Sequence, residues 1–84
     1  MKPIRLTLHA VEQCAERGAT KLEVKGAIEF GVREPAKKGR VLHRHNFQYG
    51  AEWQGKRYAI KQVAPVVVEE DNEMIVVTVY TFYF

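Results

Sequence analysis

The most regular hydrophobic pattern in the chain lies at residues 74–84, MIVVTVYTFYF, which are rich in β-branched and aromatic side chains. Residues of this kind favour a long strand, and successive side chains of a strand point to opposite faces. The pattern therefore predicts one aliphatic face and one face that carries hydroxyl groups and rings. The aliphatic face has Ile75, Val77 and Val79, and the other face has Val76, Thr78, Tyr80 and Phe82.

Two short helices are predicted before the sheet. Thr7 can cap a helix over residues 8–17, and Gly18 can end it. Thr20 and Glu23 fit a capping box for a second helix, which would stop at Gly31. The apolar residues expected to cover the sheet are Leu8, Val11, Cys14, Val24 and Ile28.

Two tight turns divide the rest of the chain into an antiparallel meander. Gln54-Gly55 and Asp71-Asn72 are typical of such turns, and strand-like residues flank both. The three predicted strands cover residues 41–53, 56–69 and 73–84. With the helices they form an α+β fold, in which two N-terminal helices pack on one face of a three- to four-stranded antiparallel sheet.

Two further features modify this picture. A short strand near residues 4–6 would be the fourth strand of the sheet, and residues 35–39, PAKKG, form a basic loop before the meander. Pro65 cannot donate a backbone hydrogen bond, so it predicts a bulge or a missing partner within the middle strand. Residues 1–84 would make a single domain.

The two turns also predict which side chains share a face. If Trp53 opposes Lys56 and Glu70 opposes Glu73, the aliphatic residues of the three strands gather on one side. This expected core face contains Phe47, Tyr49, Tyr58, Ile60, Val66, Val68, Ile75, Val77 and Val79. The expected polar face contains Arg44, Gln48, Glu52, Arg57, Lys61, Thr78, Tyr80 and Phe82.

Size and composition narrow the protein class. At 84 residues the core is small, so either a monomer or a homodimer is expected. The net charge of +3 is compatible with nucleic acid. Cys14 is the single cysteine, which excludes an internal disulfide and argues against structural zinc. Because no signal peptide, membrane span or phosphate-binding glycine loop is visible, we expect a cytoplasmic protein without a membrane partner or a cofactor.

The polar face suggests RNA cleavage as a hypothesis. Cleavage without a metal requires groups that transfer protons and cations that stabilise the transition state. Arg57 and Lys61 could supply the cations, while Trp53 and Phe82 could stack a base. The competing interpretation is an ordinary solvated sheet face, on which Arg and Lys commonly alternate with apolar residues.

Histidines and the cysteine give no separate site. His43 and His45 point the same way on a strand, but no third ligand follows at a recognisable spacing, so no metal site is predicted. A structural, hydrogen-bonded role on the core side explains them better. Cys14 belongs to an apolar stripe and is expected in the core.

Five features of the chain carry a resemblance to a known family. They are His9, the Arg17-Gly18 pair that closes the first helix, the short second helix, the Gly55-Lys56-Arg57 turn and the VVTVY stretch at residues 76–80. Over nearly its whole length the chain resembles the small bacterial and phage domains of family 4258 of the domains of unknown function. That family is grouped with RelE-like toxins and with the wider barnase-like endoribonucleases.

The resemblance implies a function and a set of site residues. The function is a metal-independent RelE-like endoribonuclease toxin, or a degenerate relative, that acts on RNA and has an antitoxin as partner. The implied catalytic residues are His9, Arg57, Lys61 and Tyr80, with Arg17 and Thr78 in binding. To these the expected polar face adds Arg44 and Gln48 as binding residues. The alternative is a non-catalytic module that binds nucleic acid or protein, for example through an exposed Tyr83 and Phe84.

Overall fold

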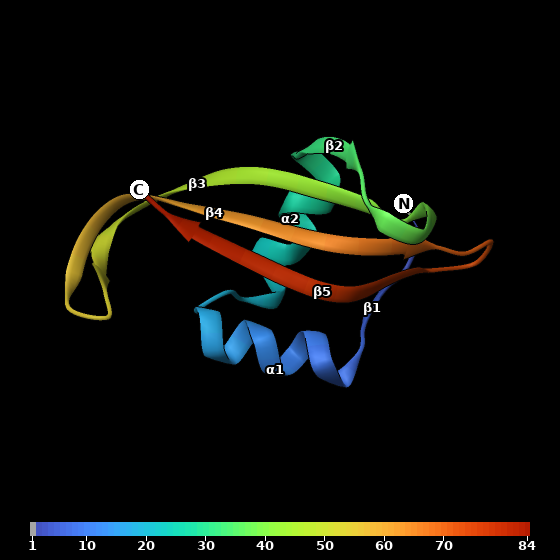
Figure 1. Ribbon diagram of the computed structural model, residues 1–84, viewed down its shortest axis with the longest axis horizontal. Helices are drawn as coiled ribbons and strands as arrows, with labels where there is room; N and C mark the ends of the chain where they lie inside the picture. The colour runs from blue at the N-terminus through green and yellow to red at the C-terminus, as the bar shows by residue number, and fades with distance from the viewer. Residues whose placement is uncertain (1) are drawn as a thin grey trace.

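The computed structural model describes residues 2–84, which form two helices, a five-stranded sheet and one short 3-10 turn. In chain order the elements are β1 (Ile4–Leu6), α1 (Leu8–Arg17), α2 (Lys21–Phe30), β2 (Val32–Pro35), the turn η1 (Lys37–Gly39), β3 (Val41–Trp53), β4 (Lys56–Glu69) and β5 (Met74–Tyr83). The strand order is β1-β5-β4-β3-β2. Both helices lie on the same side of the sheet, and the β3–β4 hairpin reaches beyond them and curls at its tip (Figure 1).

The predicted α+β class with two helices is confirmed, but the sheet is larger and mixed. The expected strand at residues 4–6 is present as β1, and it runs parallel to β5. An additional strand, β2, pairs antiparallel with the beginning of β3. Its sequence, VREP, is too short to show alternation and ends in proline, so the hydrophobic pattern gave no sign of it. The prediction of a three- to four-stranded, wholly antiparallel sheet is therefore wrong in both respects.

The helix ends follow the predicted capping residues. The Thr7 hydroxyl accepts a hydrogen bond from the backbone at the start of α1, and Gly18 ends that helix in the left-handed conformation with φ 75°. Thr20 and Glu23 form both hydrogen bonds of a capping box at the start of α2. These local signals place both helices correctly.

Both predicted turns are also present. Trp53 opposes Lys56 across the first turn. The backbone N–H of Glu70 donates to the carbonyl of Glu73 across the second, at 2.8 Å. The register next to each turn is thus the expected one, and the departures arise further along the strands.

A bulge at Gly50 of β3 changes which residues of β3 and β4 share a face of the sheet. The β3–β4 register shifts by one residue between Gln48 and Ala51, and Gly50 there has φ 57°. One extra residue in one strand reverses the alternation of its pairing with the other. As a result, Lys61 lies opposite Phe47, whereas the uninterrupted register would have placed it opposite Gln48.

A second shift lies between β4 and β5. Val66 pairs with Thr78 and Val67 with Val76, so Val77 is the extra residue. Pro65 predicts a bulge in β4 or a missing partner there; the bulge lies in the neighbouring strand, β5, and the missing partner is present. The missing N–H of Pro65 accounts for a gap in the β3–β4 pairing, which is absent between Val66 and Val63 of β4.

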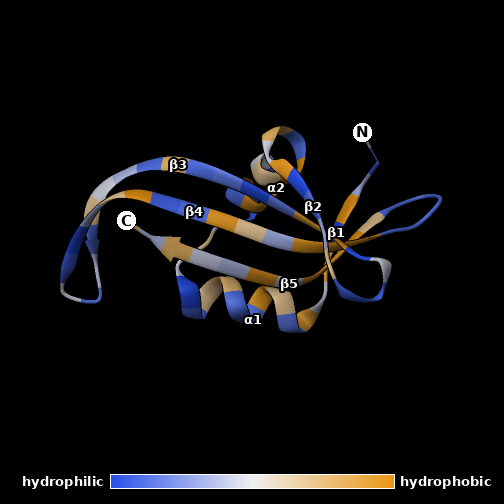
Figure 2. Ribbon diagram, turned by 45° about the horizontal axis from the view of Figure 1, so that its top comes forward, coloured by the Kyte–Doolittle hydropathy of each residue, from blue (hydrophilic) through white to orange (hydrophobic). Residues whose placement is uncertain are grey.

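The core lies between the helices and one face of β4 and β5. Hydrophobic residues follow one another along the central parts of these strands, whereas the tip of the β3–β4 hairpin is hydrophilic (Figure 2). The buried side chains of this layer are Ala10, Cys14, Val24, Ala27, Ile28, Val63, Val67, Met74, Val76 and Val79. Tyr58, Ile60, Val68, Ile75 and Val77 were expected here and are not buried, because the two bulges shift the alternation.

β1 pairs with only the first part of β5, and side chains of α1 close the edge of β5 that follows. The Gln13 side-chain oxygen accepts from the Val79 N–H at 2.8 Å, and the Arg17 guanidinium donates to the Val79 carbonyl at 2.7 Å. Side chains of α1 thereby bond the backbone groups that a further strand would use. Because this face of α1 is turned to the sheet, Leu8 and Val11 lie outside, 76% and 46% exposed. Their predicted place in the core is wrong.

His43 is a buried polar side chain without a partner. Its side chain is 2% exposed, and neither ring nitrogen has a hydrogen-bond partner among residues 2–84. Its expected side of the sheet is confirmed, but the expected hydrogen bond is not formed. Burial, and then the nearby Arg33, lower the pKa of His43, because both disfavour the charged imidazolium. No helix within residues 2–84 has the length and hydropathy needed to cross a membrane.

We predict that His43 makes stability depend on pH. Its folded-state pKa is lowered, so the unfolded chain binds the proton first. Stability should be intact above the unfolded value of about 6.5 and fall at lower pH, by up to about 1.4 kcal/mol per pH unit. Urea unfolding between pH 7.5 and 5.5 measures this loss. His43→Leu should remove most of it, whereas His9→Gln, at an exposed position of α1, should retain it. An unchanged slope in His43→Leu would contradict the assignment.

Candidate functional site

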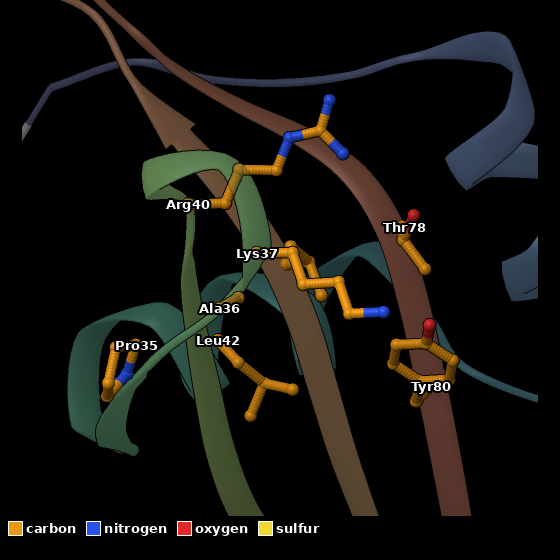
Figure 3. A pocket seen from close by; sticks show the side chains of 8 residues that line it. Pro35, Ala36, Lys37, Arg40, Leu42, Thr78 and Tyr80 are labelled. Carbon is orange, nitrogen blue, oxygen red and sulfur yellow. The ribbon is translucent and has the colours of Figure 1, made fainter.

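A pocket of about 410 Å³ opens on the side of the sheet opposite the helices, beneath the turn η1 (Figure 3). We call this side of the sheet the open face; its residues on the three long strands include Leu42, Arg44, Gln62, Val66, Thr78, Tyr80 and Phe82. The pocket is lined by Pro35, Ala36, Lys37, Arg40, Leu42, Val66, Thr78 and Tyr80. Its floor is therefore apolar, and its rim carries cations and hydroxyl groups.

Backbone hydrogen bonds hold the turn over the sheet. The Ala36 N–H donates to the Arg40 carbonyl at 2.8 Å, and the Arg40 N–H donates to the Lys37 carbonyl at 3.3 Å. Lys38 and Gly39 both have the left-handed conformation, with φ 60° and 71°. The side chains of Lys37 and Arg40 line the pocket, whereas Lys38 is exposed and does not line it.

The polar groups of the pocket are free to bind a ligand. The Lys37 ammonium points across the pocket toward the side chains of Thr78 and Tyr80 on β5 (Figure 3). No Asp or Glu is among the lining residues. Within residues 2–84, no salt bridge or side-chain hydrogen bond engages Lys37, Arg40, Thr78 or Tyr80. Two cations and two hydroxyl groups that lack internal partners make the pocket suitable for an anion.

Two aromatic rings continue the site along β5. Tyr80 and Phe82 are stacked, with ring centroids 6.5 Å apart and planes 23° apart, and each side chain is 41% exposed. The Arg17 guanidinium lies 5.4 Å from the Tyr80 ring, and the Arg44 guanidinium lies 5.6 Å from the Phe82 ring. Such cation–π contacts place a planar, positively charged group over part of each ring.

Arg44 belongs to a polar network beside these rings. It donates to Glu34 at 2.8 Å and to Gln62 at 2.8 Å, and Gln62 donates to Asn46 at 2.7 Å. The hydrogen bond from Arg44 lowers the pKa of Glu34, and Glu34 in turn raises the pKa of Arg44. The charge of Arg44 is thus partly compensated, so its main contribution to the open face is a flat surface beside Phe82.

Four of the eight site residues predicted from the sequence gather around the pocket and the ring pair. Thr78 and Tyr80 line the pocket, and Arg17 and Arg44 contact the stacked rings. Arg17 also holds the edge of β5 through Val79, so it has a structural role in addition.

Lys61 lies on the other side of the sheet, and its predicted place on the polar face is wrong. Its side chain is buried, and its ammonium donates to the Gly18 carbonyl at 2.8 Å. It also forms a salt bridge of 3.0 Å with Glu23. Lys61 shares a face of β4 with Val63 and Val67 of the core, and the Gly50 bulge in β3 sets Phe47, and not Gln48, opposite it.

The three other predicted site residues do not line the pocket. Arg57 is exposed near the tip of the β3–β4 hairpin and donates to the Gly50 carbonyl at 2.8 Å. Gln48 is exposed and pairs with Ile60, closer to that tip than to η1. His9 is exposed in the first turn of α1, one helical turn before Gln13.

Trp53 is also unavailable to an RNA base on the open face. It stacks on Tyr83, with centroids 5.1 Å apart and planes 13° apart. Both side chains pack close to Gly18 at the end of α1, where an added Cβ would lie 2.6 Å from the Tyr83 hydroxyl. Tyr83, in turn, donates to the Arg17 carbonyl at 2.7 Å. This part of the aromatic content is therefore structural.

Lys37 and Arg40 are the charged pocket residues that the sequence analysis missed. The basic loop was visible in the letters PAKKG, but it gave no direction for its side chains. The direction depends on β2, which pairs with β3 and returns the chain over the open face. Because β2 has only four residues and no alternation of polar and apolar side chains, the sequence does not predict this pairing.

Within residues 2–84, no three His, Cys, Asp or Glu side chains lie together in a group that could hold a metal ion. In comparisons with protein-family models, with curated proteins and with solved structures, nothing matches this chain. The RelE-like relationship accordingly stays a hypothesis that rests on sequence motifs.

We predict that Lys61 acts as a structural residue. Lys61→Met should lower the free energy of unfolding by about 3 kcal/mol, because Glu23 and the Gly18 carbonyl lose a largely buried partner. Lys25→Met, at an exposed position on α2, removes the same charge and should change stability by less than about 0.5 kcal/mol. Urea unfolding measures both. Equal, small effects in the two variants would show that the buried pair is absent in solution.

Proposed function

We propose that the protein binds single-stranded RNA on the open face of its sheet. The stacked Tyr80–Phe82 pair beside the cationic pocket is the observation that carries this proposal. Exposed rings stack on unpaired bases of any sequence, and nearby cations attract the phosphate backbone. Bases in a duplex are already stacked and paired, so an aromatic surface of this kind favours single strands.

The charges of the open face support an anionic polymer as ligand. Lys37 and Arg40 line the pocket, Lys38 lies in the same turn, and the net charge is +3. The nearby carboxylate of Glu34 is compensated by Arg44. A protein ligand would need acidic side chains at these cations as well as apolar groups on the rings, whereas every nucleotide of an RNA strand supplies both a base and a negative charge.

We predict that the two rings contribute to affinity separately from the charges. Tyr80→Ala and Phe82→Ala should each weaken binding of a fluorescent oligouridylate by about 5- to 150-fold, since stacking is worth about 1–3 kcal/mol per base. Fluorescence anisotropy at fixed salt measures the dissociation constant. Phe30→Ala is the matched control, because Phe30 is 69% exposed but lies in α2, on the other side of the sheet. Equal losses in all three variants would contradict the proposal.

Cleavage of the bound RNA is the second candidate function. It is favoured by the Tyr80 side chain, which lies in the pocket together with the Lys37 ammonium (Figure 3). In such a reaction the ribose 2′-hydroxyl loses its proton and attacks phosphorus, and the 5′-oxygen leaves with a proton, so a 2′,3′-cyclic phosphate forms. Tyr80 would transfer a proton, and Lys37 and Arg40 would stabilise the charge of the transition state. The similarity to RelE-like toxins, which implies the same chemistry, rests on the sequence motifs given above.

We predict that Tyr80→Phe separates binding from cleavage. The substitution retains the ring and removes the hydroxyl, so affinity for RNA should change less than about threefold. The cleavage rate should fall by about 10²-fold or more if Tyr80 transfers a proton. Gel analysis of labelled RNA in the presence of EDTA measures the rate. His9→Gln tests whether the exposed histidine of α1 takes part as well. Binding without any cleavage by the natural protein would identify a non-catalytic RNA-binding module.

A further inference from the structure

The pocket beneath η1 differs from the rest of the open face because its charges are uncompensated. Arg44 is paired with Glu34, and Arg17 donates to a backbone carbonyl. By contrast, Lys37 and Arg40 line the pocket without any carboxylate beside them. The positive charge available to a ligand is therefore concentrated at one end of the aromatic surface.

From this arrangement we infer that the pocket binds a phosphate monoester, and specifically the terminal phosphate of an RNA strand that lies on the open face. This inference rests on the proposed RNA-binding function and deepens it. It opposes the cleavage candidate, because a pocket in which the strand ends does not hold a phosphodiester with a nucleotide on each side. A terminal phosphate carries a charge of about −1.5 to −2 near neutral pH, whereas a phosphodiester within the strand carries one negative charge. The two cations of the pocket therefore match the charge of a terminal phosphate better than the charge of a phosphodiester.

The hydrogen-bonding groups match a monoester as well. A phosphate monoester presents three strong acceptor oxygens. The pocket offers an ammonium, a guanidinium and the hydroxyl groups of Thr78 and Tyr80, and the side-chain hydrogen bonds within residues 2–84 engage none of them. The pocket therefore has enough free donors for three phosphate oxygens without breaking a side-chain hydrogen bond of the folded chain.

The position of the pocket explains why the bound phosphate would end the strand. Tyr80 belongs to both the pocket and the stacked ring pair, so a base on the rings places its own phosphate beside Lys37. Pro35 and Ala36 form the wall on the side away from Tyr80, where the chain of β2 enters η1 (Figure 3). An RNA strand running from the rings into the pocket meets this wall and stops.

The experiment compares trinucleotides that differ only at their ends. Uridine trinucleotides with 2′-O-methyl groups, which block cleavage, carry a 3′-phosphate, a 5′-phosphate or no terminal phosphate. Binding to the full chain is followed by NMR titration at fixed salt. We expect one of the two phosphorylated forms to bind at least about tenfold more tightly than the unphosphorylated form, with shifts at Leu42 and Thr78 in the pocket.

Two variants of the same turn provide the control. Lys37→Gln should abolish the gain in affinity from the terminal phosphate, whereas Lys38→Gln, with the same loss of charge, should retain it, because Lys38 does not line the pocket. Thermal unfolding of both should match the natural protein, since the Lys37 side chain makes no hydrogen bond or salt bridge within residues 2–84. Equal losses in the two variants would overturn the pocket assignment.

Other outcomes separate this inference from the proposed function. If the phosphorylated and unphosphorylated trinucleotides bind equally and Tyr80 and Phe82 are still required, RNA binding stands and the terminal-phosphate site is overturned. Inorganic phosphate and uridine 3′-monophosphate are titrated in parallel. If inorganic phosphate binds as tightly as the phosphorylated trinucleotide, the pocket takes a free phosphate and its assignment to RNA is overturned.

Discussion

The hydrogen bonds of the Lys61 ammonium join the middle of the sheet to the junction between the two helices. Its partners are the Gly18 carbonyl, at the end of α1, and the Glu23 carboxylate, in the first turn of α2. A largely buried lysine is tolerated only when its charge is paired and its donors are used, and both conditions are met here. Lys61 reaches these partners because it lies on the same face of β4 as Val63 and Val67, which pack in the core beneath the helices. The extra residue at Gly50 aligns the core-facing side of β3, with Phe47, to this face of β4.

Once the helices are fixed on that face, the remaining surface of the sheet is free for a ligand. α1 also closes the edge of β5, through Gln13 and Arg17 on Val79, so this part of the sheet cannot easily add another strand. The turn η1 then covers one end of the open face and supplies Lys37 and Arg40. Charge and aromatic surface meet at Tyr80, which is the reason for placing the site there.

Local signals in the sequence predicted the elements well. Capping residues such as Thr7 and Thr20 act within a few residues, and the turn at Gln54-Gly55 sets its own register, so each could be recognised without knowing the rest of the fold. Thr78 and Tyr80 were correctly expected opposite the helices. The α+β class followed from the same local information.

The strand registers and pairings that depend on single residues far along the chain could not be predicted from local signals. A lone glycine within a strand, such as Gly50, is a known sign of a bulge, but the sequence does not say whether the strand bulges or simply bends. That difference decides whether Phe47 or Gln48 lies opposite Lys61. The extra residue Val77 has no such sign at all, because valine is a good strand former in any position. Lys37 and Arg40 line the pocket because β2 pairs with β3. This pairing is a tertiary contact, and the local sequence pattern does not show it.

The central claim is that the open face, and not the outer surface of the helices, meets RNA. Methyl NMR spectra recorded during titration with a single-stranded oligouridylate test this directly, because leucine and valine methyl groups lie on both surfaces. The account predicts progressive shifts for Leu42 and Val66, which line the pocket, and none for Leu8, Val11 and Leu22, which are exposed on the helices. Shifts confined to the helix residues, or no shifts at all, would contradict it.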